Sequence, residues 1–260
     1  MKCRHCCRGN AQNENMSEEY IDIFLSQVDK LGHVTFTGGE PSLNVEIMQY
    51  FVDKCKSLNI PMNSFALITN GINIKQDFID VCIDLYQTSV YKYDGCVSLS
   101  NDVYHVEQKR FDESLLQTLP FYRRRSEIRK DVNIIREGRA KNLKEANRYG
   151  AGTSAFTSIQ SFEKNYITLN VHGEIINGID WSYDNQKHHR LCKVENLTKF
   201  YNYMTNNKFI KEDWERLSDL DKMYLIERER EIAEEWQQWE DEHHEEKLPA
   251  IIRTIKVLQK

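Results

Sequence analysis

Three cysteines crowd the start of the chain in the order Cys3-x-x-Cys6-Cys7. Two thiolates three positions apart in one loop can hold a single metal ion or part of an iron–sulfur cluster. A zinc ion would need two further ligands at compatible spacing, and the neighbouring residues do not supply them, because His5 is expected to point away from the Cys3/Cys6 pair. Taken alone, the segment therefore leaves open a metal or cluster site and, as the alternative, exposed thiols in a frayed end.

A second group of chemically suggestive residues is Thr37-Gly38-Gly39-Glu40-Pro41. The two glycines allow a ligand to approach the backbone without meeting a Cβ atom. The Glu40 carboxylate can accept hydrogen bonds from a cationic group, and Pro41 suits the first turn of a helix. A phosphate-binding loop is excluded because its Gly-Lys-Ser/Thr ending is missing. The alternative is a tight strand-to-helix turn with a solvated Glu40.

The segments around these motifs predict strands that alternate with helices. We expect helices over residues 17–31, 44–58, 77–86, 103–123 (broken near Pro120) and 139–148, and strands over 33–37, 64–69, 96–99 and 131–135. The strands are short and continuously apolar, which is typical of a parallel sheet covered on both faces. The fold class expected from this order is α/β.

The pattern changes after residue 150. Residues 166–171 and 174–176 flank His172-Gly173 and predict a β-hairpin. From about Asn196 the sequence is helical in character, and a tryptophan-rich stripe predicts a helix face packed on the rest of the protein. We therefore divide the chain into a core over 1–150, a hairpin-containing region over 151–195 that completes or covers it, and an acidic helical extension over 196–260.

Composition excludes several classes of protein. The 260 residues carry a formal net charge of −5, and residues 211–247 hold 15 acidic and six basic side chains. A general nucleic-acid binder would need a surplus of Lys and Arg, so we expect no nucleic-acid partner. No run approaches the roughly 18 apolar residues of a membrane helix, and the first residues contain no apolar stretch. We expect a cytoplasmic protein without a membrane partner.

Together, the two motifs resemble those of the radical S-adenosylmethionine (SAM) superfamily. In that family a Cys-x3-Cys-x2-Cys loop holds a [4Fe-4S] cluster, and a Gly-Gly-Glu-Pro strand end binds the amino group of SAM. Here Cys3 and Cys6 match the second and third cysteines, and the matching SAM-binding residues are Gly38, Gly39, Glu40 and Pro41. The resemblance covers residues 1 to about 150 and implies a partial (β/α)6-type barrel of parallel strands.

Further positions resemble the family more weakly. Thr69-Asn70-Gly71 looks like the segment that often ends the barrel's third strand, so Asn70 is expected near SAM. By the same resemblance Ser98 would hydrogen-bond the SAM ribose and Arg110 would bind its carboxylate. Gly138-Arg139-Ala140 is similar to a Gly-Arg-Ala that some members carry after strand five. Without the resemblance, Ser98 is an ordinary strand serine and Arg110 a helix-surface cation.

The family's first cluster cysteine and its first barrel strand have no counterpart before Cys3. We expect the sequence to be incomplete at its N-terminus and to lack strand 1, through a misassigned start or a truncation. A decayed copy that has lost its function is the alternative. As written, the chain is expected to be weakly catalytic or inactive.

The remaining cysteines are not expected to hold a second, all-cysteine cluster. Cys55, Cys82 and Cys96 fall in helices and strands and read as core residues. Cys192 is expected to be a buried thiol at a helix start, or a single ligand to something external. Cys7 is not expected to reach the cluster, because it is adjacent to Cys6.

The resemblance implies a radical SAM enzyme that cleaves SAM reductively at a [4Fe-4S] cluster and abstracts hydrogen from a substrate. An electron donor such as flavodoxin or ferredoxin is implied, and a peptide or protein substrate is favoured. The sequence does not identify the substrate or any catalytic residue beyond the cofactor ligands. Two alternatives stay open: a barrel that binds SAM or a partner without radical chemistry, and a zinc module, which would leave Gly-Gly-Glu-Pro unexplained.

Overall fold

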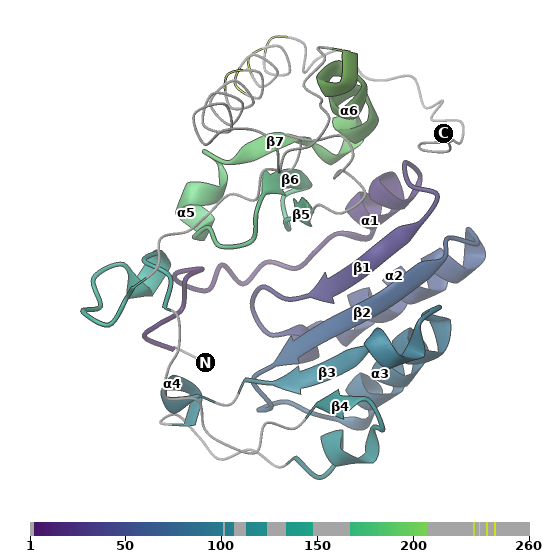
Figure 1. Cartoon of the computed structure of the whole chain (residues 1–260), viewed down its shortest axis with the longest axis vertical. Helices are drawn as coiled ribbons and strands as arrows, with labels where there is room; N and C mark the ends of the chain where they lie inside the picture. Colours follow the sequence, from purple (N-terminus) through teal and green to yellow (C-terminus); the bar gives the residue numbers. More distant parts are fainter. Residues whose placement is uncertain are drawn as a thin grey trace, which may run out of the picture.

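The computed structural model describes residues 3–100, 102–106, 113–123, 134–147 and 167–206, together with positions 231, 234, 238 and 242. These residues contain a four-stranded parallel sheet and a three-stranded antiparallel sheet (Figure 1). Arg110 and most of the expected C-terminal helical extension lie outside the described residues. Within the described part, no helix is both long and apolar enough to cross a membrane.

The parallel sheet has the strand order β1-β2-β3-β4. Its strands are β1 (Leu31–Phe36), β2 (Met62–Thr69), β3 (Cys96–Leu99) and β4 (Tyr122–Arg123). Two helices connect the first three strands, α2 (Val45–Ser57) and α3 (Gln76–Thr88), and both lie on the same face of the sheet (Figure 1). The expected α/β architecture with alternating helices and parallel strands is thus confirmed over this region.

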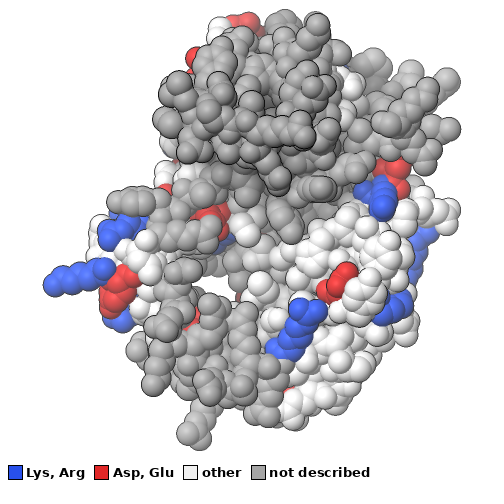
Figure 2. All heavy atoms as spheres, in the orientation of Figure 1, with Lys and Arg blue, Asp and Glu red and all other residues white. Residues whose placement is uncertain are grey.

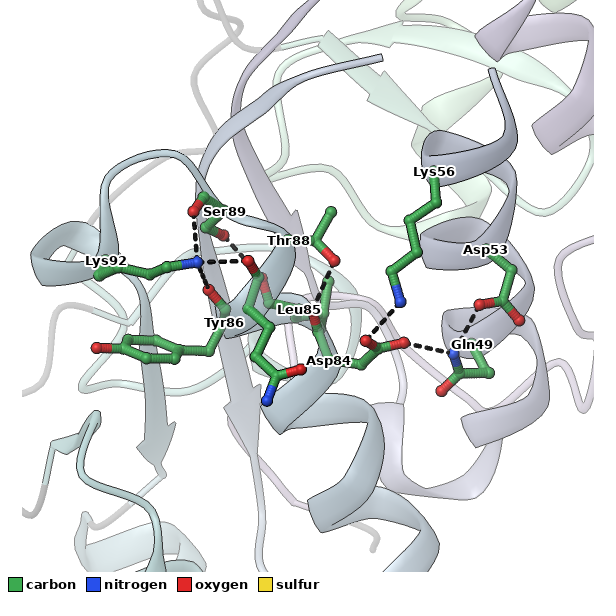
Figure 3. Close-up of polar contacts among 10 residues, drawn as sticks. Gln49, Asp53, Lys56, Asp84, Leu85, Tyr86, Thr88, Ser89 and Lys92 are labelled. Carbon is green, nitrogen blue, oxygen red and sulfur yellow. Dashed lines mark hydrogen bonds and ion pairs between the residues drawn. The ribbon is translucent and has the colours of Figure 1, made fainter. Parts of the chain in front are cut away.

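The main core lies between the sheet and these helices. Phe65, Leu67 and Val97 are fully buried on the helix side of the sheet, opposite Phe78 and Leu85 of α3. Helices α2 and α3 are also joined by polar contacts, because the Asp84 carboxylate accepts hydrogen bonds from Lys56 and Gln49 (Figure 3). Lys92 donates to the carbonyl oxygens of Tyr86 and Ser89 and so satisfies the end of α3 (Figure 3).

The other face of the sheet mixes polar and apolar residues and is partly open toward the strand ends. Thr35, Ala66 and Cys96 are paired across β1, β2 and β3, and Ile68 is paired with Ser98 one step nearer the strand ends. Ile68 is 45% exposed, whereas the alternate positions on the helix side are buried. Near the strand ends the helix-covered face is therefore buried more completely than the other face, so the strands are less completely buried there than their apolar sequences predict.

Helix α1 (Glu18–Leu25) is capped by Ser17, whose Oγ accepts a hydrogen bond from the N–H of Glu19 at 3.2 Å. The expected extension of this helix to residue 31 is wrong. The hydroxyl of Ser26 and the amide of Gln27 both donate to the carbonyl of Ile23, and such side-chain bonds compete with continued helix.

The segment after β3 differs most from expectation. In place of a long helix over 103–123, the described residues form a four-residue helix α4 (Val103–Val106), a 3-10 turn η3 (Leu116–Thr118) and strand β4. The aromatic ring of Phe121 stacks on Tyr86 with centroids 4.4 Å apart, and its carbonyl accepts from the N–H of Val97. These tertiary contacts hold the segment against the sheet edge.

The segment around residue 138 is also less regular than expected. The helix expected over 139–148 is replaced, in its described part, by a single 3-10 turn η4 (Gly138–Ala140) and loops. Asn147 closes this loop, since its side chain and backbone both bond the backbone of Ile134. Of the strand expected over 131–135, Ile134 is irregular and Ile135 forms only an isolated β-bridge, and the other residues lie outside the described ranges.

The expected hairpin around His172-Gly173 is confirmed. It joins β5 (Ile167–Leu169) to β6 (Glu174–Asn177), and a third strand, β7 (Arg190–Lys193), pairs with β6. Cys192 is fully buried within β7, so the expectation that it begins a helix is wrong. Helix α6 (Leu197–Asn206) follows this sheet.

A buried glutamine ties the two sheets together. The side-chain amide of Gln27, just after α1, donates to the carbonyl oxygen of Val194 at 2.7 Å. Its Oε1 accepts from both the backbone N–H and the hydroxyl of Thr198, each at 3.1 Å. Gln27 is only 3% exposed, and these bonds with the one to Ile23 satisfy its polar atoms without water.

Candidate functional site

The candidate site lies at the carboxyl ends of the parallel strands. In Figure 1 the arrowheads of β1, β2 and β3 point toward the N-terminal segment that carries the cysteines. Figure 2 shows a hollow on this face, between the strand ends and that segment. Ligands of open α/β sheets bind at this edge.

The glycines after β1 leave their backbone accessible. Gly38 has a φ of +116°, a conformation that a side chain would strain. An added Cβ at Gly38 or Gly39 would meet nothing within 4 Å. The space above this backbone is therefore open, as the expected approach of a ligand requires.

The carboxylate of Glu40 is held by hydrogen bonds from nearby residues of the same chain. Its Oε1 accepts from the N–H and hydroxyl of Ser42, at 3.1 and 2.8 Å, and from the hydroxyl of Thr69 at 2.6 Å. Its Oε2 accepts from the N–H of Asn70 at 2.7 Å. A carboxylate has about four acceptor positions, two on each oxygen, so room for an added donor remains at Oε2. Glu40 is thus a tie between the ends of β1 and β2 and not a free, solvated side chain.

Three of the other expected cofactor residues, Pro41, Asn70 and Ser98, also lie near the strand ends. Pro41 opens the 3-10 turn η1 (Pro41–Leu43) that leads toward α2. The side chain of Asn70 accepts from the N–H of Ile72 and shapes the loop after β2. Ser98 is half-buried in β3, paired with Ile68 of β2 and Arg123 of β4. Arg110 cannot be placed relative to them, since it falls outside the described ranges.

The cysteine loop is fixed by residues from beyond position 134. The carbonyl of Cys3 accepts from Nε of Arg139 at 2.9 Å, and that of Cys6 accepts from the Arg139 N–H at 3.0 Å. A Cβ at Gly138 would lie 2.4 Å from both the carbonyl oxygen of Cys7 and the backbone nitrogen of Gly9. The loop therefore packs so closely that only glycine fits at 138.

A third segment supports the other end of the loop. The Arg8 guanidinium donates to the carbonyl of Trp181 at 2.8 Å, and the N–H of Tyr183 donates to the Arg8 carbonyl at 3.1 Å. The cysteine loop is consequently anchored and not frayed, which argues against the surface-thiol interpretation.

The thiols differ in their surroundings. Cys3 is buried, whereas Cys6 and Cys7 are half-buried. Burial raises the pKa of the Cys7 thiol, with a partly opposing effect of Arg8, and so disfavours the thiolate that a metal requires. Two soft sulfur donors at Cys3 and Cys6, on a loop with a fixed backbone, match the ligand type of an iron–sulfur cluster and supply two of the cysteines that such a cluster takes.

A histidine–aspartate pair lies beside this loop, and sequence reasoning did not assign it a role. Nδ1 of His105 and Oδ1 of Asp102 are 2.8 Å apart. Burial of the ring lowers its pKa, but hydrogen bonds to Asp102 and to Cys3 outweigh that effect and raise the pKa of His105 to about 9. The Asp-x-x-His spacing, one helical turn, is the signal that could have indicated the pair.

His5 completes a cluster of titratable groups. Its ring stacks on Tyr104 at 4.6 Å between centroids and meets the edge of His105 at 4.9 Å. The possible ligand atoms of His5, Asp102 and His105 all lie within 4.8 Å of one another. The loop after β3 therefore brings Asp102 and His105 beside His5. Their spacing in the sequence did not reveal this proximity.

A comparison with known protein families gives a match for the first part of the chain. Residues 1–119 match a family model described as a 4Fe-4S single cluster domain, a domain typical of radical SAM enzymes. The matched range contains the cysteine loop, the Gly-Gly-Glu-Pro motif and the first three strands of the parallel sheet. No curated protein and no solved structure matches the chain significantly.

Proposed function

We propose that this chain, whose residues 1–119 match a 4Fe-4S single cluster domain typical of radical SAM enzymes, binds SAM and initiates radical chemistry on a substrate. The observation that carries the proposal is the matched domain, with its cysteine loop facing the carboxyl ends of the strands. The geometry of the Gly38–Glu40 segment supports SAM as the cofactor, because open backbone and an acidic side chain suit an amino-acid ammonium group.

Each part of the site has a distinct task in this proposal. Cys3 and Cys6 ligate the cluster, and Arg139 holds their backbone carbonyls in place. The backbone at Gly38 and Gly39 binds the ammonium group of SAM, with Oε2 of Glu40 as a charged acceptor beside it. A [4Fe-4S] cluster held by Cys3 and Cys6 would, when reduced, supply the electron for the reductive cleavage of SAM.

The open face of the sheet supplies the surroundings for the substrate. Thr35, Ile68 and Ser98 line this face and offer both apolar and hydrogen-bonding contacts. Asn70 and Ser98 are proposed to orient the nucleoside part of SAM. A peptide or protein substrate, and a flavodoxin or ferredoxin as electron donor, belong to the same proposal.

Anaerobic reconstitution tests the proposal. The protein should turn brown, absorb broadly near about 400 nm and release 5′-deoxyadenosine from SAM after reduction. The release should be weak, since Cys3 and Cys6 match only two of the three cysteines of the family's loop. Cys6→Ala should lose iron and SAM cleavage, whereas the matched variant Cys7→Ala should keep the cluster.

The result separates the proposed enzyme from the two alternatives. A reconstituted protein with a complete cluster that binds SAM without forming 5′-deoxyadenosine would contradict radical catalysis and favour a binding function. Colourless protein that retains zinc would contradict the cluster itself.

A further inference from the structure

Two histidines and an aspartate converge beside the cysteine loop. One ligand atom from each of His5, Asp102 and His105 can be chosen so that all three atoms lie within 4.8 Å of one another. The group contains no cysteine, so it is separate from the sulfur pair assigned to the cluster. His5 belongs to the cysteine loop, whereas the other two residues follow β3. An ion bound among them would therefore join the two segments.

His5 has a buried ring nitrogen without a partner in the described part of the chain. Its Nδ1 is inaccessible to solvent, and none of the described residues forms a hydrogen bond with it. The ring is nevertheless held in place, because it stacks on Tyr104 and meets the edge of His105. A buried polar atom without a partner is costly, and a bound cation would engage the free lone pair of this nitrogen.

Asp102 and His105 have a spacing that two ligands of one ion adopt. Oδ1 of Asp102 and Nδ1 of His105 are 2.8 Å apart. At metal–ligand distances of about 2.0–2.2 Å, two ligands at a right angle lie about 3 Å from each other. An ion can therefore take the place of the hydrogen that the two atoms share, which leaves as a proton. The backbone N–H groups of Tyr104 and His105 donate to the same carboxylate oxygen and fix its position.

The types of ligand select the class of ion. Two imidazole nitrogens and one carboxylate oxygen suit first-row transition metals such as Zn²⁺, Co²⁺ and Fe²⁺. Ca²⁺ and Mg²⁺ take mainly oxygen ligands, of which this group offers too few. Three protein ligands also leave coordination positions open for water or for an atom of a substrate.

We propose that His5, Asp102 and His105 bind one divalent transition-metal ion at a site separate from the iron–sulfur cluster. The side chains of His105 and Asp102 are 14% and 13% exposed, so the bound ion would be largely shielded from bulk water. The proposal does not depend on the proposed function, since none of its ligands is a cysteine.

The positive charges near this group have other partners. Nε of Arg139 donates to the carbonyl oxygen of Cys3 at 2.9 Å, and Arg4 lies 3.5 Å from a carboxylate oxygen of Glu145. Asp102 supplies the negative charge that partly neutralises the ion. Because it is the one charged ligand, we expect the affinity to depend strongly on both imidazoles.

Anaerobic titration of the cluster-free full chain with Co²⁺ tests the proposal. The starting protein carries Cys6→Ser and Cys7→Ser, so that the loop offers no pair of thiolates. We expect one Co²⁺ per chain, with visible absorption bands but without a sulfur-to-cobalt charge-transfer band. His5→Ala and His105→Ala should each weaken binding about tenfold or more. Asp102→Asn keeps an oxygen ligand but loses the charge, and should weaken binding less.

The matched control is His172→Ala, which removes an exposed histidine paired with Glu14 and should leave Co²⁺ binding unchanged. A second measurement needs no substitution among the three ligands. It is nuclear magnetic resonance of the starting protein, labelled with 15N-histidine and titrated with Zn²⁺. Of the eight histidines in the chain, two should change the resonances of their ring nitrogens, and the change should saturate at one Zn²⁺ per chain.

Several results would overturn the proposal. These are the absence of stoichiometric binding, a sulfur-to-cobalt charge-transfer band, or unchanged Co²⁺ affinity in folded His5→Ala and His105→Ala. If these variants do not fold, the resonance experiment decides, and unshifted histidine nitrogens at saturating Zn²⁺ would contradict the site. None of these results bears on the cluster, which reconstitution of the unmodified chain tests separately.

Discussion

Glu40 is the residue whose role changes most between sequence and structure. The sequence presents it as an acceptor for an ammonium group, and the structure shows a carboxylate that already ties Ser42, Thr69 and Asn70 together. Thr69 and Ser42 are buried, at 0% and 3% exposure, so their donors depend on this carboxylate. Under the proposed function, SAM binding and stability are therefore coupled at one side chain.

Replacing Glu40 should have two measurable effects. Glu40→Ala should lower the free energy of unfolding by about 2 kcal/mol, because buried donors lose their acceptor. It should also weaken SAM binding by roughly 1.5–3 kcal/mol, the usual contribution of a charge-assisted hydrogen bond. Denaturation of the cluster-free protein measures the first effect, and calorimetric titration of reconstituted protein with SAM measures the second.

Glu40→Gln serves as the control, since its amide oxygen can still accept from Ser42 and Thr69 while the negative charge is gone. It should lose less stability than Glu40→Ala but a similar share of SAM affinity. Unchanged SAM affinity in both variants would show that Glu40 is a structural tie only.

The cysteines differ in reactivity for reasons of burial. Burial raises the pKa of Cys55 to about 11 and raises that of Cys82 further. At pH 8 the thiolate fraction of Cys55 should be about one in a thousand, and thiolate is the reactive form. Brief iodoacetamide treatment of the native, cluster-free protein should therefore spare both residues and modify the half-buried Cys6, as peptide mass spectrometry would reveal.

The control for this experiment is labelling in denaturant, where Cys55, Cys82 and Cys6 should react alike. Equal labelling of Cys55 and Cys6 in the native state would mean that α2 does not pack as the structure shows.

At the scale of elements, the contact between η4 and the cysteine loop is the most sensitive to substitution. Gly138→Ala places a Cβ 2.4 Å from backbone atoms of Cys7 and Gly9, at a φ of +54°. The loop must move, and iron loading after reconstitution should fall by at least half, because ligand geometry depends on that backbone. Gly32→Ala in β1, where an added Cβ meets nothing within 4 Å, should load iron normally. Normal loading of Gly138→Ala would show that the close contact is dispensable.

Elements with a strong local signal could be predicted from the sequence. The helices near residues 45–57 and 76–88 and the strands that precede Gly38-Gly39 and Asn70-Gly71 follow from apolar runs and from the glycines close to the strand ends. Strand β4 could not be foreseen, because Tyr122 and Phe121 are drawn to the sheet edge by Val97 and Tyr86, which are distant in sequence. The docking of Arg139 on Cys3 is hidden for the same reason.

The candidate site was foreseeable to a similar extent. The residue types at positions 3, 6 and 38–41 predict their chemistry from the sequence alone, because soft sulfur donors suit a cluster and paired glycines open the backbone to a ligand, and that chemistry stays a prediction. The arrangement of His5, Asp102 and His105 depends on a loop that returns to the N-terminal segment, and no local pattern encodes that return.

At the scale of the whole molecule, Gln27 joins the parallel sheet to the antiparallel one. Gln27→Leu should leave the Val194 carbonyl and the Thr198 N–H without their partners in a buried interface. The expected loss is about 2–4 kcal/mol in the free energy of unfolding, since each buried unsatisfied group costs about 1–3 kcal/mol. Urea denaturation followed by tryptophan fluorescence and circular dichroism measures it.

Gln49→Leu provides a comparison, because the Gln49 amide bonds the carboxylates of Asp53 and Asp84, which water can still reach, and its loss should cost much less. A Gln27→Leu protein as stable as the unmodified one would show that the two sheets do not depend on this residue.

The anchoring of the cysteine loop also bears on how the boundaries of this protein should be drawn. The match to the family model ends at residue 119. The cysteine loop, however, is held by contacts with Gly138, Arg139, Trp181 and Tyr183. Gln27, just after α1, is hydrogen-bonded to Val194 and Thr198. The region that matches the family model is thus smaller than the region whose contacts hold the cysteine loop in place. A fragment cut at residue 119 would retain the metal-binding signature and lose the supports that give it a shape.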